Sequence, residues 1–180
     1  MSEGNIRTIN FWEAYGLLYR KAASVQKDYF SYSPAEKGPL FYALELCGET
    51  GELLNVCKKI IRTKDSDKYS RLVHKEFPEE AADCAIALTM LAQSIGDEPS
   101  KPSSDEFPSI SELHPLLILL SKRTSALYAA AWENNIPSKD ISLTLDLLFK
   151  ISQIFTCDLV TAVTEKLNKI ALRALEKHYD

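Results

Sequence analysis

Two pairs of acidic residues, each pair three positions apart, are the residues of this sequence best suited to chemistry. Glu49 and Glu52 form the first pair, and Glu80 and Asp83 form the second. Because positions i and i+3 lie about 60° apart around an α-helix, each pair projects from one side of its helix. Both sides are predicted to be apolar, and a carboxylate on a buried surface is unfavourable unless something neutralises it. Four converging carboxylates therefore predict a bound cation, and hard oxygen ligands favour Mg²⁺ or Mn²⁺.

Two other interpretations of the acids remain open. Charged runs often line a solvated helix face, although here the first pair shares its face with apolar side chains. Those predicted to lie near Glu49 are Tyr42, Leu46, Leu53, Val56 and Ile60. A di-iron carboxylate bundle is the other alternative, and it would need a Glu-x-x-His motif. None of the three histidines follows an acid at that spacing; they are His74, His114 and His178.

Length and composition indicate one globular domain spanning residues 1–180. The 180-residue chain is 46% hydrophobic, which is enough to build a core, and its net charge of -4 argues against a nucleic-acid-binding protein. The four cysteines form no C-x-x-C pair, so we interpret them as reduced core thiols. No signal-peptide pattern or membrane-length apolar run is present, which predicts a cytoplasmic protein without a membrane partner.

Helical periodicity dominates the chain, and no convincing strand pattern occurs. The expected helices span about residues 10–26, 39–62, 74 or 78–95, 111–134, 138–156 and 158–177. Ser111 and Ser138 are the expected N-caps of the fourth and fifth helices. The polar residues 63–71 predict a loop, and the proline-rich and serine-rich residues 96–111 predict a mobile linker.

The predicted fold is an all-α helical bundle of about five to six helices. The short connections favour antiparallel neighbours. The acid pairs occupy only two of the helices, which need others to cover them. We therefore expect a homodimer or a larger homo-oligomer such as a tetramer.

The acid pairs lie in a wider pattern. The helix expected at 39–62 reads E-x-G-E-L from Glu49, and the next helix reads E-E-x-x-D, ending at Asp83, with 27 residues between Glu52 and Glu80. With this pattern the chain resembles the MazG-like all-α nucleoside-triphosphate pyrophosphohydrolases, which include dCTP and dUTP pyrophosphatases. The resemblance covers about residues 41–96, with a weaker match at 163–173. Residues 97–137, with the helix expected at about 111–134, then resemble an insertion.

The resemblance implies an oligomeric enzyme that cleaves a (d)NTP between its α- and β-phosphates. The products would be a (d)NMP and pyrophosphate, which suits the removal of unwanted nucleotides. Glu49, Glu52, Glu80 and Asp83 match the residues that hold Mg²⁺ in the family. Divalent ions neutralise phosphate charge and activate water, so the chemistry agrees with these residues independently. The general base stays unassigned, with secondary roles open to Glu45 and Glu79.

Substrate contacts are expected from cations and aromatic rings. Lys166, Lys169 and Arg173 share one side of the last predicted helix and are candidate phosphate ligands, although a solvated basic flank is the alternative. Phe30, Tyr32 and Trp12 are candidate base-binding residues, each of which could instead be a core residue.

The chain departs from the dCTP-directed relatives at two places. Lys59 and Ile60 stand where those relatives carry a tryptophan, and Ala87 stands where they carry a tyrosine. These departures argue against dCTP specificity and leave the metal chemistry untouched. A catalytically silent nucleotide- or metal-binding regulator on the same bundle is the alternative function.

Overall fold

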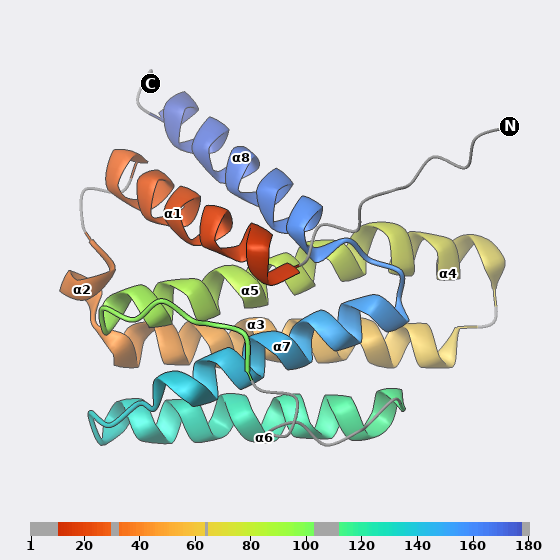
Figure 1. Cartoon of the computed structure of the whole chain (residues 1–180). Coiled ribbons are helices and arrows are strands. Elements are labelled where there is room, and N and C mark those ends of the chain that lie inside the picture. The colour runs from red at the N-terminus through yellow and green to blue at the C-terminus, as the bar shows by residue number, and fades with distance from the viewer. Residues whose placement is uncertain (1–10, 30–32, 64, 103–111, 178–180) are drawn as a thin grey trace, which may run out of the picture.

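The computed structural model describes residues 11–29, 33–63, 65–102 and 112–177, and within these residues the chain is all-helical. Six long helices are joined by shorter segments (Figure 1). The long helices are α1 (Phe11–Tyr29), α3 (Pro39–Arg62), α5 (Phe77–Ser94), α6 (Leu113–Trp132), α7 (Ser138–Ile154) and α8 (Leu159–Lys177). The shorter ones are α2 (Pro34–Lys37), α4 (Ser66–Arg71) and the π-helical turn η1 (Leu72–Glu76). The predicted all-α fold is confirmed.

The prediction of a loop at residues 63–71 is wrong, because α4 begins at Ser66. The Asp65 carboxylate caps this helix by accepting hydrogen bonds from the backbone N–H groups of Asp67 and Lys68. A side chain at this position satisfies N–H groups that have no partner inside the helix. None of the α4 residues is buried, so the segment lacks the apolar periodicity on which the prediction depended.

The turn η1 joins α4 to α5 without a break. Its wide hydrogen bond runs from the Phe77 N–H to the Leu72 carbonyl. Pro78 follows at once; it has no N–H, and its ring would clash with the carbonyl four residues earlier in a regular helix. A π-turn just before the proline relieves that clash and rotates the following residues. Leu72 and Phe77 are both buried, so the turn directs the start of α5 into the core.

The ends of the later helices differ in part from the predictions. Ser138 is the first residue of α7, whose N-cap is Pro137, so the predicted serine cap is wrong. Ser111 lies outside the described residues, and Glu112 occupies the N-cap position of α6. At the start of α8 the Asp158 carboxylate accepts hydrogen bonds from the N–H groups of Val160 and Thr161.

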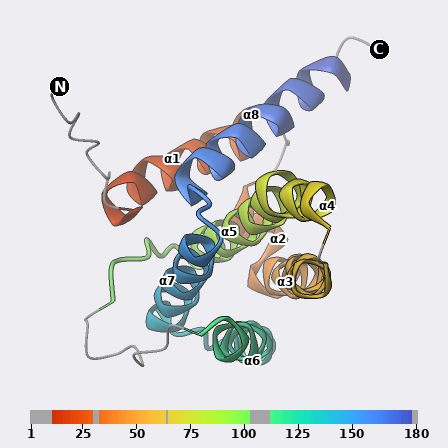
Figure 2. The same ribbon diagram turned by 90° about the vertical axis from the view of Figure 1, so that its right-hand side faces the viewer.

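The long helices form layers around α5. In Figures 1 and 2, α1 and α8 lie together on one side of α5, and α6 lies at the opposite edge beyond α7. Helix α3 packs against both α5 and α6. Apolar residues spaced three or four positions apart fill the interfaces between these helices, as expected for helices with one buried stripe. On α7 the fully buried residues of this stripe are Ile141, Leu145, Leu148 and Ile151.

Residues 97–102 leave α5 as irregular chain, and the rest of the predicted linker, residues 103–111, lies outside the described residues. Gly96, with a positive φ of 72°, ends α5 in a conformation that suits glycine. All four cysteines are free; Cys57 and Cys84 are buried, whereas Cys47 and Cys157 are partly exposed. Among the described residues no single helix has the length and hydropathy to cross a membrane; α7 and α8 meet that test only as a pair, bent by 105°.

Candidate metal centre and substrate pocket

Helices α3 and α5 bring three of the four predicted metal ligands together. One carboxylate oxygen from each of Glu49, Glu52 and Glu80 lies within 4.8 Å of the other two. The first two residues come from adjacent turns of α3, and the third comes from the first turn of α5. The extensive packing between α3 and α5 therefore builds the cluster.

The acid cluster lies at the boundary between core and solvent. The five apolar residues predicted to share the face of Glu49 are all buried; they are Tyr42, Leu46, Leu53, Val56 and Ile60. Glu49 and Glu80 are half-buried, as expected for acids at the edge of that face. Glu52 is exposed, so the expectation that both acids of the first pair lie on the apolar face is correct only for Glu49. The cluster is therefore open to a small solute.

The electrostatics of the cluster favour a cation. Burial raises the pKa of Glu49 to about 7, and the charges of Asp83, Glu52 and Glu80 add to this effect. Burial likewise raises the pKa of Glu80, with further contributions from Glu52 and Asp83. Crowded carboxylates destabilise one another's ionised forms. A cation among them relieves this repulsion.

Asp83, the fourth predicted ligand, is paired with a lysine from α8. The Lys166 ammonium donates a hydrogen bond to the Asp83 carboxylate. Burial still raises the pKa of Asp83, although Lys166 opposes this effect. The Lys166 charge also opposes the rise in the pKa values of Glu49 and Glu80. Lys166 therefore acts on Asp83, Glu49 and Glu80 together.

The other predicted phosphate ligands lie along α8. Lys169 Nζ is 2.9 Å from Glu79 Oε1, and this contact lowers the pKa of Glu79. Arg173 is exposed on the same helix. Their neighbour Asn168, which the family resemblance offers as a further substrate contact, accepts a hydrogen bond of 2.8 Å from the Lys21 ammonium of α1. Of these residues, only Lys166 is joined directly to a predicted metal ligand in the described part of the chain.

A largely apolar pocket of about 190 Å³ adjoins the acid cluster. It lies among α1, α3, α5 and α8, and its main apolar lining residues are Val25, Phe41, Tyr42, Ile86, Met90 and Leu167. Gln26 and Glu45 are its polar lining residues. Glu45 precedes Glu49 by one helical turn, and Ile86 follows Asp83 by nearly one turn. Two helices, α3 and α5, thus connect the acids to the pocket.

Among the described residues, the aromatic side chains that line this pocket are Phe41 and Tyr42. Trp12 does not line it; the indole N–H instead donates to Asp146 of α7 at 3.2 Å. Phe30 and Tyr32 lie outside the described residues. Phe41 was missed, and it packs edge-to-face against Tyr42 with ring centroids 5.1 Å apart. Its place one turn before Glu45 on the acid-bearing helix is the signal that could have identified it.

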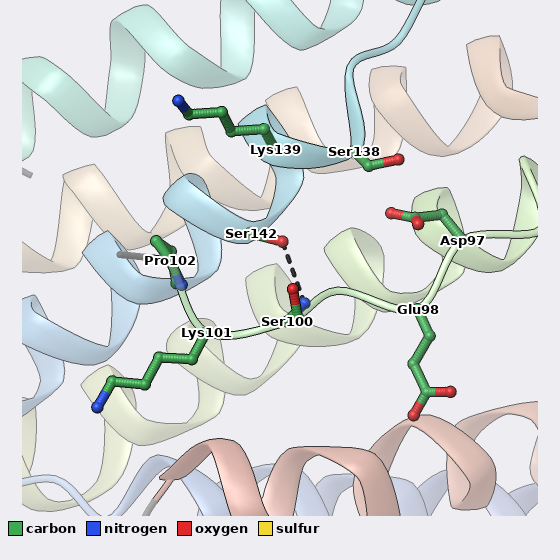
Figure 3. A pocket seen from close by; sticks show the side chains of 8 residues that line it. All are labelled: Asp97, Glu98, Ser100, Lys101, Pro102, Ser138, Lys139 and Ser142. Atoms are coloured by element: carbon green, nitrogen blue, oxygen red, sulfur yellow. Dashed lines mark hydrogen bonds between the residues drawn. The ribbon is translucent and has the colours of Figure 1, made fainter. Parts of the chain in front are cut away.

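A second hollow, of about 380 Å³, lies between residues 97–102 and the start of α7 (Figure 3). The Ser100 N–H donates to Ser142 Oγ across it at 3.2 Å. Lys101 and Lys139 line this hollow, but their side chains point away from it. Asp97 and Glu98 add negative charge. These groups do not converge on one place, so we assign no ligand to this hollow.

The donor set of the acid cluster fits a hard divalent ion. Three carboxylates supply oxygen ligands, no described histidine or cysteine joins them, and their mutual repulsion favours positive charge. Comparison of the chain with protein-family models, with curated proteins and with solved structures found no match. The MazG-like resemblance and the identity of the metal therefore stay predictions.

Proposed function

We propose that this chain is a Mg²⁺-dependent nucleotide pyrophosphohydrolase that converts a (d)NTP to a (d)NMP and pyrophosphate. The observation that carries the proposal is the convergence of Glu49, Glu52 and Glu80 within 4.8 Å. Mn²⁺ would suit the same oxygen ligands. A nucleoside triphosphate also needs a place for its base, and the adjoining apolar pocket supports this part of the proposal.

The residues of the site would have different roles: metal binding, phosphate binding and base binding. Glu49, Glu52 and Glu80 would hold the ion, with Asp83 available from the same side. When bound, Mg²⁺ supplies positive charge to the phosphate oxygens and lowers the pKa of bound water. Lys166 lies where its ammonium could pass from Asp83 to a phosphate oxygen. The rings of Phe41 and Tyr42 offer apolar surface to a base.

The general base stays unassigned among the acids. A carboxylate whose pKa lies near the working pH is suited to proton transfer, and the pKa of Glu49 is raised to about 7. Bound metal would lower that pKa again, because it stabilises the ionised form. Glu79 is engaged by Lys169, so it is less suited to this role than the acids of the cluster.

Pyrophosphate release from a panel of NTPs and dNTPs, with Mg²⁺ and with EDTA, tests the proposal. We expect metal-dependent release from some members of the panel. Glu49→Gln and Asp83→Asn should each lower turnover by about 100-fold or more, because each removes a carboxylate that acts on the metal. Circular dichroism should show an intact fold in both variants. Turnover equal to that of the wild type in either variant would contradict the proposal.

A matched control is Glu133→Gln, because this glutamate is exposed just beyond α6 and outside the acid cluster. It should retain full activity. Mg²⁺-dependent nucleotide binding without turnover in the wild type would instead favour the silent regulator.

A further inference from the structure

The pocket beside the acid cluster contains a carboxylate that the proposed chemistry does not use. Glu45 lines this pocket together with the apolar side chains of α1, α5 and α8. It does not belong to the group of carboxylates whose oxygens lie within 4.8 Å of one another. Its position one turn before Glu49 places it toward the pocket end of the site. A role in substrate selection therefore suits Glu45 better than a role in metal binding.

The pocket has a suitable length and size for the base of a nucleotide whose phosphates lie at the acids. On α5 its lining residues Ile86 and Met90 follow Asp83 by three and seven positions, or roughly 4.5 and 10 Å along the helix axis. Its volume of about 190 Å³ is smaller than that of typical pockets for whole drug-sized ligands. A base held in this pocket would present its polar edge to Glu45, the charged lining residue.

The carboxylate of Glu45 restricts which polar groups of a nucleotide base can lie against it. An ionised carboxylate accepts hydrogen bonds and cannot donate them, so it pairs with N–H groups and repels carbonyl oxygens. Burial raises the pKa of Glu45, and the nearby Lys37 ammonium opposes this effect.

We propose that Glu45 reads an exocyclic amino group of the substrate base, so that amino-bearing bases are preferred to their keto counterparts. The inference rests on the proposed function, because it assumes that the acid cluster holds the phosphates. Cytosine or adenine nucleotides would then be preferred to uracil or hypoxanthine nucleotides. Any preference for cytosine would depend on Glu45 and not on the tryptophan and tyrosine of the dCTP-directed relatives. Size complementarity with the pocket would decide between purine and pyrimidine.

Matched pairs of nucleotides that differ at one group test the inference. Isothermal titration with Mg²⁺ should compare the α,β-methylene analogues of CTP and UTP, and of ATP and ITP. In at least one pair, we expect the wild type to bind the amino member about tenfold more tightly, as for a hydrogen bond to a charged group. In Glu45→Gln that ratio should fall to about threefold or less, because an amide can also donate to a keto oxygen.

The controls separate this inference from the proposed function. Glu133→Gln should preserve the wild-type ratio, and thermal melting should show that Glu45→Gln is folded. Equal affinities within both pairs for the wild type, or an unchanged ratio in Glu45→Gln, would overturn the role of Glu45 while nucleotide binding itself stands. If the folded, metal-loaded protein binds none of the four analogues, the proposed function is overturned, and the role of Glu45 with it.

Discussion

The Lys166 ammonium of α8 contacts the Asp83 carboxylate of α5, although the two residues lie 83 positions apart in the chain. Their side chains are only 23% and 20% exposed, so water screens the pair less than it would on an open surface. A divalent ion that coordinates Asp83 must compete with this ammonium. Under the proposed function, metal binding and phosphate binding would thereby be linked through one lysine.

The first prediction follows from this competition. Lys166→Met should raise the affinity for Mn²⁺ in the absence of nucleotide by roughly tenfold, because a unit positive charge beside the acids is removed. The same variant should bind nucleotide more weakly, because a candidate phosphate ligand is lost. Titration calorimetry with Mn²⁺ alone, and then with a nucleotide analogue, measures both effects.

Lys169→Met provides the comparison for this experiment. Its ammonium pairs with Glu79, and both side chains are about half exposed. Solvent screens such a pair, so the change in Mn²⁺ affinity should be much smaller than in Lys166→Met. Equal Mn²⁺ affinities in wild type and Lys166→Met would show that the lysine does not oppose the metal.

The second prediction concerns pH. The pKa of Glu49 is raised from 4.5 to about 7 in the folded protein, so the folded state holds this proton more tightly than the unfolded state. Its contribution to stability is therefore fully present below about pH 4.5 and is lost as the pH rises through about 7. Protons also compete with metal, so Mn²⁺ affinity should rise over the same range.

Glu49→Gln isolates the contribution of this group. Without Mg²⁺, the melting temperature of the wild type should fall relative to that of Glu49→Gln as the pH rises from 5 to 8. Added Mg²⁺ should reverse the difference, because an ion that binds only the folded state stabilises it. A constant difference across this pH range would show that Glu49 titrates normally.

The third prediction distinguishes packing from base binding at Trp12. The indole N–H donates to Asp146 at 3.2 Å, and the ring packs edge-to-face against Phe11 and Tyr15. Trp12→Phe should therefore lower the free energy of unfolding by about 1 kcal/mol, mainly through the lost hydrogen bond. Nucleotide affinity should not change, because Trp12 lies outside the pocket that contains Glu45. Weaker nucleotide binding at unchanged stability would restore Trp12 as a base contact.

The fourth prediction concerns self-association. Leu44 is 57% exposed on α3, one turn after the exposed ring of Phe41 on the same helix. A second copy of the chain would bury these side chains. We expect light scattering to show a homodimer or tetramer for the wild type and a smaller species for Leu44→Lys. Leu17→Lys on α1, where the leucine is 64% exposed, is the matched control and should leave the mass unchanged. A monomeric wild type would contradict the prediction.

Local features of the site could be predicted from the sequence because they depend on residues within a few turns of helix. The i, i+3 spacing of each acid pair sets its direction from the helix, and the apolar residues around Glu49 follow the same periodicity. The α4 helix was missed for the corresponding reason. It buries no residue, so only its cap at Asp65 marked it.

Six long helices, and the acids that two of them carry, could be predicted from the sequence because hydrophobic periodicity is a local property. Which side chains meet depends on the tertiary structure. The packing of α3 on α5 brings Glu52 to Glu80, and the position of α8 brings Lys166 to Asp83. The pocket of Glu45 likewise needs four helices at once. Such contacts depend on how the buried faces of distant helices fit together, and no spacing within one helix encodes that fit.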